Sequence, residues 1–108
     1  MNLNKYLTSQ RKKNGRGLTD DSSYPTAKRI TCTDGFSLSV QATKGAYCAP
    51  RQNIGPWEEV EVGFPSGTPE LIMSYAEEAD RPTATVYCYV PIQLVEQLIE
   101  LHGGMRKE

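Results

Sequence analysis

The chain has 108 residues, of which 38% are hydrophobic and 23% charged, and its net charge is -1. This length fits one domain of ordinary size and excludes two. No run approaches the roughly 18 apolar residues of a membrane span, and no signal-peptide stretch follows the first residues. We therefore expect a cytoplasmic protein without membrane contact. Three cysteines are an odd number and favour free thiols over a disulfide framework.

Charge is divided unevenly along the chain. Residues 1–19 hold five basic and no acidic residues, whereas residues 57–81 hold seven acidic residues and one basic residue. Residues 1–27 are mostly polar, with two glycines and a proline, so we expect a flexible basic arm there, with a short possible helix around Leu3 to Ser9, and a single domain over residues 28–108. The arm offers five cations to a nucleic-acid backbone: Lys5, Arg11, Lys12, Lys13 and Arg16.

Two alternating runs flank the dipeptide Asp34-Gly35, over residues 29–33 and 36–41. Asp-Gly between such runs predicts a β-hairpin with a type I′ turn. Residues 42–56 then lose all periodicity, which predicts a long irregular loop of the kind that often carries function. A third strand is expected next, with Val60, Val62 and Phe64 on its inner face.

The C-terminal half predicts two helices around a fourth strand. Thr68-Pro69-Glu70 combines an N-cap hydroxyl, a proline at the first helical position and an acid, which predicts a helix over residues 69–78. Its inner side chains are expected to be Leu71, Ile72 and Tyr75. The fourth strand is expected over residues 83–89, directing Val86 and Cys88 inward. A last helix after Pro91 has an apolar stripe of Ile92, Val95, Leu98, Ile99 and His102, and it ends at Gly103-Gly104.

The element order β-β-β-α-β-α predicts an α+β fold with a four-stranded, mostly antiparallel sheet and both helices on one face. The opposite face is then open unless the loop, a second copy or a foreign partner covers it. By strand parity, this face displays Arg29, Thr31, Ser37, Ser39, Gln41, Trp57, Glu59, Glu61, Thr85, Tyr87 and Tyr89.

The sequence contains no recognisable catalytic or metal motif. Cys48, in the loop, is the one thiol with a plausible reactive setting, because Cys32, Cys88 and His102 fall on inward positions. The cysteines lack the close pairs of a zinc site, and nucleotide and hydrolase motifs are missing. We expect no catalytic residue, metal or cofactor, and therefore no enzyme.

Aromatic and charged side chains make the open face the candidate partner-binding surface. Exposed Trp and Tyr near charged groups are typical of binding hot spots. Together with the neighbouring loop, this face gives seven candidate residues: Trp57, Glu59, Glu61, Tyr87, Tyr89, Tyr47 and Arg51.

Five short segments follow one another in order: residues 33–42 (TDGFSLSVQA), 47–51 (YCAPR), 60–66 (VEVGFPS), 89–91 (YVP) and 102–104 (HGG). Over residues 28–104, this succession resembles small uncharacterised proteins encoded by bacteriophages. If the chain is phage-encoded, the expected cytoplasm is that of the host bacterium. The resemblance carries no functional residues over. It implies a context in which short phage proteins act stoichiometrically on host machinery, including inhibition of CRISPR and other defence systems.

The leading hypothesis is a phage-type accessory protein that binds and inhibits or redirects a host protein or nucleoprotein complex, such as an anti-CRISPR inhibitor. A homodimer is also compatible with an open sheet face. One alternative is a nucleic-acid-binding protein that uses the basic arm. Another is a small enzyme or nucleotide-sequestering protein that uses the loop over residues 42–56.

Overall fold

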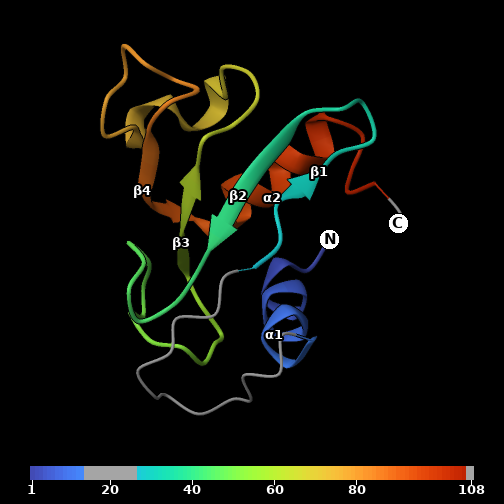
Figure 1. Cartoon of the computed structure of the whole chain (residues 1–108), viewed down its shortest axis with the longest axis vertical. Coiled ribbons are helices and arrows are strands. Elements are labelled where there is room, and N and C mark those ends of the chain that lie inside the picture. The colour runs from blue at the N-terminus through green and yellow to red at the C-terminus, as the bar shows by residue number, and fades with distance from the viewer. Residues whose placement is uncertain (14–26, 107–108) are drawn as a thin grey trace.

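The structure, a computed structural model, describes residues 1–13 and 27–106, and for residues 11–13 it describes the backbone alone (Figure 1). Four antiparallel strands form one sheet in the order β1-β2-β3-β4, which confirms the predicted α+β fold class. The elements are α1 (Leu3–Lys13), β1 (Ile30–Thr31), β2 (Ser37–Gln41), β3 (Glu59–Gly63), the 3-10 helix η1 (Glu70–Tyr75), β4 (Val86–Pro91) and α2 (Ile92–Leu101).

The predicted β1–β2 hairpin is confirmed, but its turn is of another type. Ile30 pairs with Leu38, and the N–H of Cys32 donates to the carbonyl of Phe36 at 2.7 Å. Within the turn, only Gly35 has a positive φ, of 97°. A type I′ turn needs positive φ at two residues, whereas a three-residue loop ending in a left-handed glycine needs one. Gly35 therefore closes a three-residue loop with a bulge, one residue longer than the two-residue loop of a type I′ turn.

A β-bulge in β4 reverses the predicted parity of that strand. Val60 pairs with Val90 and Val62 pairs with Tyr87, so two residues of β4 lie opposite the single residue Glu61. Tyr87 and Val90 are consequently both buried, although they lie three positions apart, a spacing that places residues on opposite faces of a regular strand. The predictions that Tyr87 points outward and Cys88 inward are wrong, because the extra residue shifts the alternation.

The apolar stripe of α2 is confirmed along most of its length. Ile92, Val95, Leu98 and Ile99 are buried, and the helix crosses one face of the sheet behind β1 and β2 (Figure 1). Helix α2 ends where predicted, because the two glycines that follow it have φ of 88° and 84°. Their N–H groups donate back to the carbonyls of Glu100 and Ile99.

Helix α1 belongs to the folded core, so the predicted flexible arm is wrong for residues 3–13. Leu3 and Leu7, four residues apart, are both buried. The N–H of Leu3 donates to Oε2 of Glu96 on α2 at 2.8 Å. Two leucines on one helical face are enough here because tertiary packing stabilises a helix that its polar composition disfavours. Residues 14–26 of the predicted arm lie outside the described residues.

The predicted helix over residues 69–78 is shorter and has 3-10 geometry. Ile72 is buried as predicted, but Leu71 is exposed and Tyr75 is half-buried. No side chain caps the start at Pro69. At Ala76 the chain turns extended, bridges to Tyr87, and donates the N–H of Glu77 to the carbonyl of Val86. Pairing with the edge of β4 therefore ends the helix early.

Candidate functional site

The loop over residues 42–56 folds around Trp57, which is a core residue and not part of an exposed surface. Its side chain is only 2% exposed, and the indole N–H donates to the carbonyl of Gln52 at 3.0 Å. Its backbone exchanges hydrogen bonds with the side-chain amide of Asn4 on α1. The prediction that Trp57 lies on the open face is wrong, because the loop and α1 together enclose the ring.

The loop itself is an ordered piece of structure with its own buried polar group. Asn53 is fully buried, and its side-chain oxygen accepts the N–H of Lys44 at 2.8 Å. The N–H of Ala49 donates to the carbonyl of Glu59, and this hydrogen bond attaches the loop to the first residue of β3. The loop therefore has a defined surface to present.

Two tyrosines and an arginine meet where the loop crosses the bulge of β4. Tyr47 and Tyr89 are 39% and 41% exposed, and their ring centroids lie 6.0 Å apart at an angle of 53°. The guanidinium carbon of Arg51 lies 5.5 Å from the centroid of Tyr47, within range of a cation–π interaction. We call these three residues, Tyr47, Arg51 and Tyr89, the tyrosine-arginine surface.

The backbone fixes the position of both tyrosines. Tyr89 has φ of 53°, a left-handed conformation that aims its side chain out of the bulge. Its N–H donates to the carbonyl of Tyr47 at 3.0 Å, and the N–H of Tyr47 donates to Oε1 of Glu61 at 2.9 Å. Glu61 is therefore a positioning residue that holds the loop against the sheet.

The structure brings together four of the seven candidate residues: Tyr47, Arg51, Glu61 and Tyr89. Glu59 lies partly exposed on β3, where its carbonyl accepts a hydrogen bond from the N–H of Ala49 in the loop. Tyr87 is buried, and its hydroxyl donates to the carbonyl of Pro82 at 2.7 Å, so it belongs to the core. Thr85, placed on the open face by parity, is buried too.

None of the three thiols has the setting of a reactive cysteine. Cys48 is buried, and its thiol donates to the carbonyl of Thr43 at 3.2 Å. Burial raises the pKa of Cys48, and this rise is only partly opposed by hydrogen bonds with the backbone of Thr43 and Gln52 and by the charge of Arg51. Burial likewise raises the pKa of Cys32 and of Cys88. The protonated thiol is a poor nucleophile, so the burial of Cys48 disfavours the alternative of an enzyme that uses this thiol.

His102 is a half-buried partner of the hairpin turn and not a residue of the apolar stripe. Its ring stacks on Phe36 with centroids 3.9 Å apart, and its Nδ1 lies 2.7 Å from Oδ2 of Asp34. The pKa of Asp34 is lowered, first by the N–H of Phe36 and then by the His102 hydrogen bond. No local sequence pattern indicates this pair, because its members lie 68 positions apart.

The basic residues of the nucleic-acid alternative are only partly placed. Lys5 is exposed on α1, while the backbone of Arg11, Lys12 and Lys13 continues that helix. Arg16 lies outside the described residues. A nucleic-acid contact stays a prediction.

Within residues 1–13 and 27–106, no helix has the length and apolar character to cross a membrane. Over the same ranges, no group of three or more histidine, cysteine or acidic side chains is arranged to hold a metal ion. Comparisons with protein-family models, curated proteins and solved structures find no match to this chain. We therefore infer function from the geometry of the tyrosine-arginine surface.

Proposed function

We propose that this chain is a phage-type accessory protein that binds a host protein or nucleoprotein complex through the tyrosine-arginine surface and thereby inhibits or redirects it. Bacterial defence systems, including CRISPR complexes, are the target class that the phage resemblance favours. The observation that carries the proposal is the convergence of Tyr47, Arg51 and Tyr89, each exposed, from a loop and a bulge that are otherwise well anchored.

The composition and rigidity of this surface suit binding. Tyrosine and arginine are among the residues that most often dominate the energy of protein interfaces. Holding Tyr89 in a left-handed conformation costs about 1–3 kcal/mol, a strain of the kind that clusters at ligand-binding positions. Because backbone hydrogen bonds already fix both tyrosines, little further ordering is needed when a partner binds.

Acidic groups border the same surface and indicate a basic partner. Glu77 and Glu61 both lie near enough to Cys88, in the bulge, to add to the rise in its pKa that burial begins. A partner with a pocket for tyrosine rings and a rim of lysine or arginine would complement this arrangement. Further exposed acids continue along the chain at Glu58, Glu70, Glu78 and Asp80.

The test is affinity capture from a bacterial lysate with quantitative mass spectrometry, comparing wild type with a Tyr47→Ala, Tyr89→Ala double variant. Phe64→Ala is the matched control, because Phe64 is also an exposed aromatic with positive φ, yet none of the described residues forms a ring or cation–π pair with it. Two hot-spot losses of about 2 kcal/mol each reduce capture by well over tenfold.

The control variant should retain its captured protein. Equal recovery by the double variant, with its circular dichroism spectrum unchanged, would contradict the proposal.

A further inference from the structure

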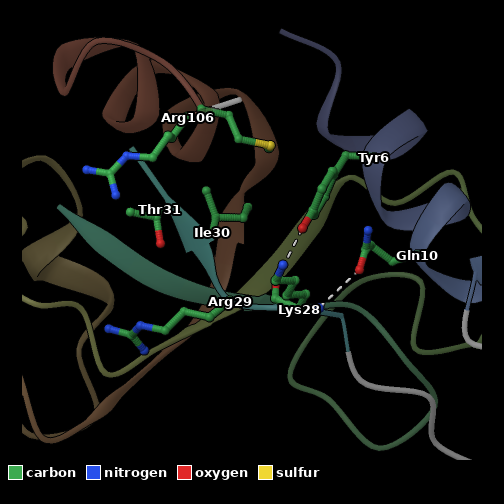
Figure 2. Close-up of a pocket in the computed structure, with 8 residues that line it drawn as sticks. Tyr6, Gln10, Lys28, Arg29, Ile30, Thr31 and Arg106 are labelled. Atoms are coloured by element: carbon green, nitrogen blue, oxygen red, sulfur yellow. Dashed lines mark hydrogen bonds between the residues drawn. The ribbon is translucent and has the colours of Figure 1, made fainter. Parts of the chain in front are cut away.

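A cavity of about 490 Å³ lies at one end of the sheet, between α1, β1 and the C-terminal segment (Figure 2). Tyr6 and Gln10 of α1 line one side, residues 28–31 line the next, and Met105 and Arg106 line the third. The lining includes three basic residues and no acidic residue. The volume lies within the range of about 300–1,000 Å³ that small-molecule sites occupy. The cavity is therefore large enough for a small organic anion.

The C-terminal segment closes the outer edge of β1 and thereby places Arg106. Cys32 bridges Met105, and the N–H of Arg106 donates to the carbonyl of Thr31 at 2.8 Å. This antiparallel register sets Arg106 directly opposite Thr31, so their side chains leave the same face of the sheet. Arg29, two residues before Thr31, shares that face. Figure 2 shows the three side chains on one side of β1.

Neutral oxygens hold the guanidinium group of Arg29 in place. Its Nε donates to Oγ of Ser37 at 3.0 Å, and its Nη2 donates to the carbonyl of Phe64 at 2.6 Å and to that of Ser37 at 3.2 Å. Because none of these acceptors is charged, they orient the guanidinium without neutralising it. None of the described residues accepts a hydrogen bond from Nη1, so both N–H bonds of this nitrogen are left for a ligand.

The two arginines have no counterion among the described residues. No described carboxylate pairs with Arg29 or Arg106, and no described hydrogen bond engages the Arg106 guanidinium or the Thr31 hydroxyl. Arg29 and Arg106 occupy diagonal positions of the pairing, which typically lie about 7–8 Å apart. Two guanidinium groups at this spacing favour an anion of charge about -2, such as a phosphate monoester near pH 7. Guanidinium groups bind phosphate oxygens through paired N–H bonds.

The rest of the cavity offers an aromatic ring and apolar side chains. Tyr6 is half-buried, and its hydroxyl donates to the carbonyl of Lys28 at 3.3 Å, which fixes the ring (Figure 2). Oε1 of Gln10 accepts the N–H of Lys28 at 3.2 Å, so α1 is held beside the strand at two points. Ile30 and Met105 complete the lining. An aromatic ring in such a position is a platform on which a nucleobase stacks.

We propose that this cavity reversibly binds a nucleoside monophosphate. The phosphate accepts hydrogen bonds from Nη1 of Arg29, from the guanidinium of Arg106 and from the hydroxyl of Thr31. The base stacks on the ring of Tyr6. None of these residues belongs to the tyrosine-arginine surface, and the site does not depend on it.

The test is an NMR titration of the isotope-labelled full chain with AMP, GMP, CMP and UMP in turn. Shifts of the backbone amide resonances report both the affinity and the place of binding. Matched ligands are the nucleosides, which lack the phosphate, and inorganic phosphate, which lacks the nucleoside. We expect at least one nucleotide to bind saturably and to shift the Thr31 and Arg106 amides. Its nucleoside and inorganic phosphate should each bind at least about tenfold more weakly, because each lacks one set of contacts.

Variants of the protein separate recognition of the nucleotide from general attraction of anions. Arg29→Gln and Arg106→Gln should each weaken nucleotide binding about tenfold, because a charge-assisted contact to phosphate is lost. Arg81→Gln removes the same charge from an exposed arginine outside the cavity and should bind as wild type. Tyr6→Leu should weaken nucleotide binding about fivefold and leave the affinity for inorganic phosphate unchanged. If Tyr6→Leu fails to fold, the comparison of nucleotide with inorganic phosphate still tests the base contact.

Four results would overturn the proposal. They are a lack of saturable binding by all four nucleotides, a nucleoside that binds as tightly as its nucleotide, inorganic phosphate that does so, and equal weakening by Arg81→Gln and Arg106→Gln. The last result would mean that charge alone attracts anions to the chain. Because the titration contains no partner protein, its outcome is independent of partner capture by the tyrosine-arginine surface.

Discussion

The β1–β2 hairpin and the β3–β4 pair are both antiparallel ladders, but only the hairpin keeps the alternation of its sequence. Along β2, Leu38 and Val40 are buried, while Ser37 and Ser39 are partly exposed. Along β4, the bulge at Cys88 and Tyr89 buries Tyr87 against expectation. In the hairpin, the residue with positive φ is Gly35, which the Asp-Gly dipeptide marks in the sequence. In the bulge, the residue with positive φ is Tyr89, which no sequence pattern marks. Alternation predicts exposure only while the register is unbroken.

The largest expected effect is on the loop beside the bulge. Trp57→Ala removes a buried ring and should lower the free energy of unfolding by about 3–5 kcal/mol, as measured by urea denaturation. Phe64→Ala, which changes an exposed aromatic in the adjoining strand connection, should change it by less than about 0.5 kcal/mol. Similar losses for the two variants would mean that Trp57 is not enclosed.

Substitutions at two glycines separate the effect of packing on stability from the effect of backbone conformation. In Gly55→Ala the added Cβ would lie 2.8 Å from the Trp57 ring, so we expect a loss of about 1–3 kcal/mol from overpacking. In Gly35→Ala the Cβ meets nothing within 4 Å, and the loss of about 1–2 kcal/mol comes from the positive φ.

Urea denaturation in a Trp57→Leu background distinguishes these causes. The effect of Gly55→Ala should shrink there, whereas that of Gly35→Ala should be additive. An unchanged Gly55→Ala effect would mean that the ring is not what restricts this position.

The hairpin should respond to acid through Asp34. Its pKa is lowered in the folded protein, so its stabilising contribution is present above the ordinary aspartate pKa of about 3.9 and is lost as the pH falls through the folded value. Asp34→Asn keeps an oxygen for the N–H of Phe36 but removes the charge. The difference in Tm between wild type and variant should therefore be present at pH 6 and narrow below pH 4. A constant difference would contradict a role for the charge.

The smallest effect on stability is expected at Tyr89. Asparagine tolerates the left-handed conformation better than tyrosine, so Tyr89→Asn should leave the free energy of unfolding unchanged or raise it by about 1 kcal/mol. The same variant should lose partner capture. A destabilised Tyr89→Asn protein would mean that the ring contributes to the core.

Periodicity and turn chemistry predicted the order of the strands, most of the α2 stripe and the end of α2 at Gly103-Gly104. The prediction that Phe64 lies on the inner face of the third strand is wrong, because β3 ends at Gly63 and Phe64 is exposed. Periodicity and turn chemistry also failed where tertiary contacts outweigh local preference. Leu3 and Leu7 give only a weak helical pattern, but their burial in the core stabilises α1. The helix after Pro69 is cut short because Ala76 pairs with β4.

The candidate site was predictable in its loop residues and only partly in its strand residues, because Glu61 and Tyr89 lie there whereas Trp57 and Tyr87 are buried in the core. Tyr47 and Arg51 are exposed in a loop that was expected to carry function. Tyr87 was misplaced because a bulge formed without glycine leaves no mark in the sequence. Trp57 was misplaced because its burial depends on Asn4 and Gln52, contacts that no periodicity encodes.

Site-specific photocrosslinking tests most directly whether the tyrosine-arginine surface is the partner site. p-Benzoylphenylalanine is introduced by Tyr89→p-benzoylphenylalanine or, as the control, by Phe64→p-benzoylphenylalanine, and each protein is irradiated in a bacterial lysate. We predict one dominant crosslinked protein at position 89, lost when Arg51→Glu is added and not found at position 64. Crosslinking at position 64 alone, or a pattern unchanged by Arg51→Glu, would contradict the assignment of partner binding to this surface.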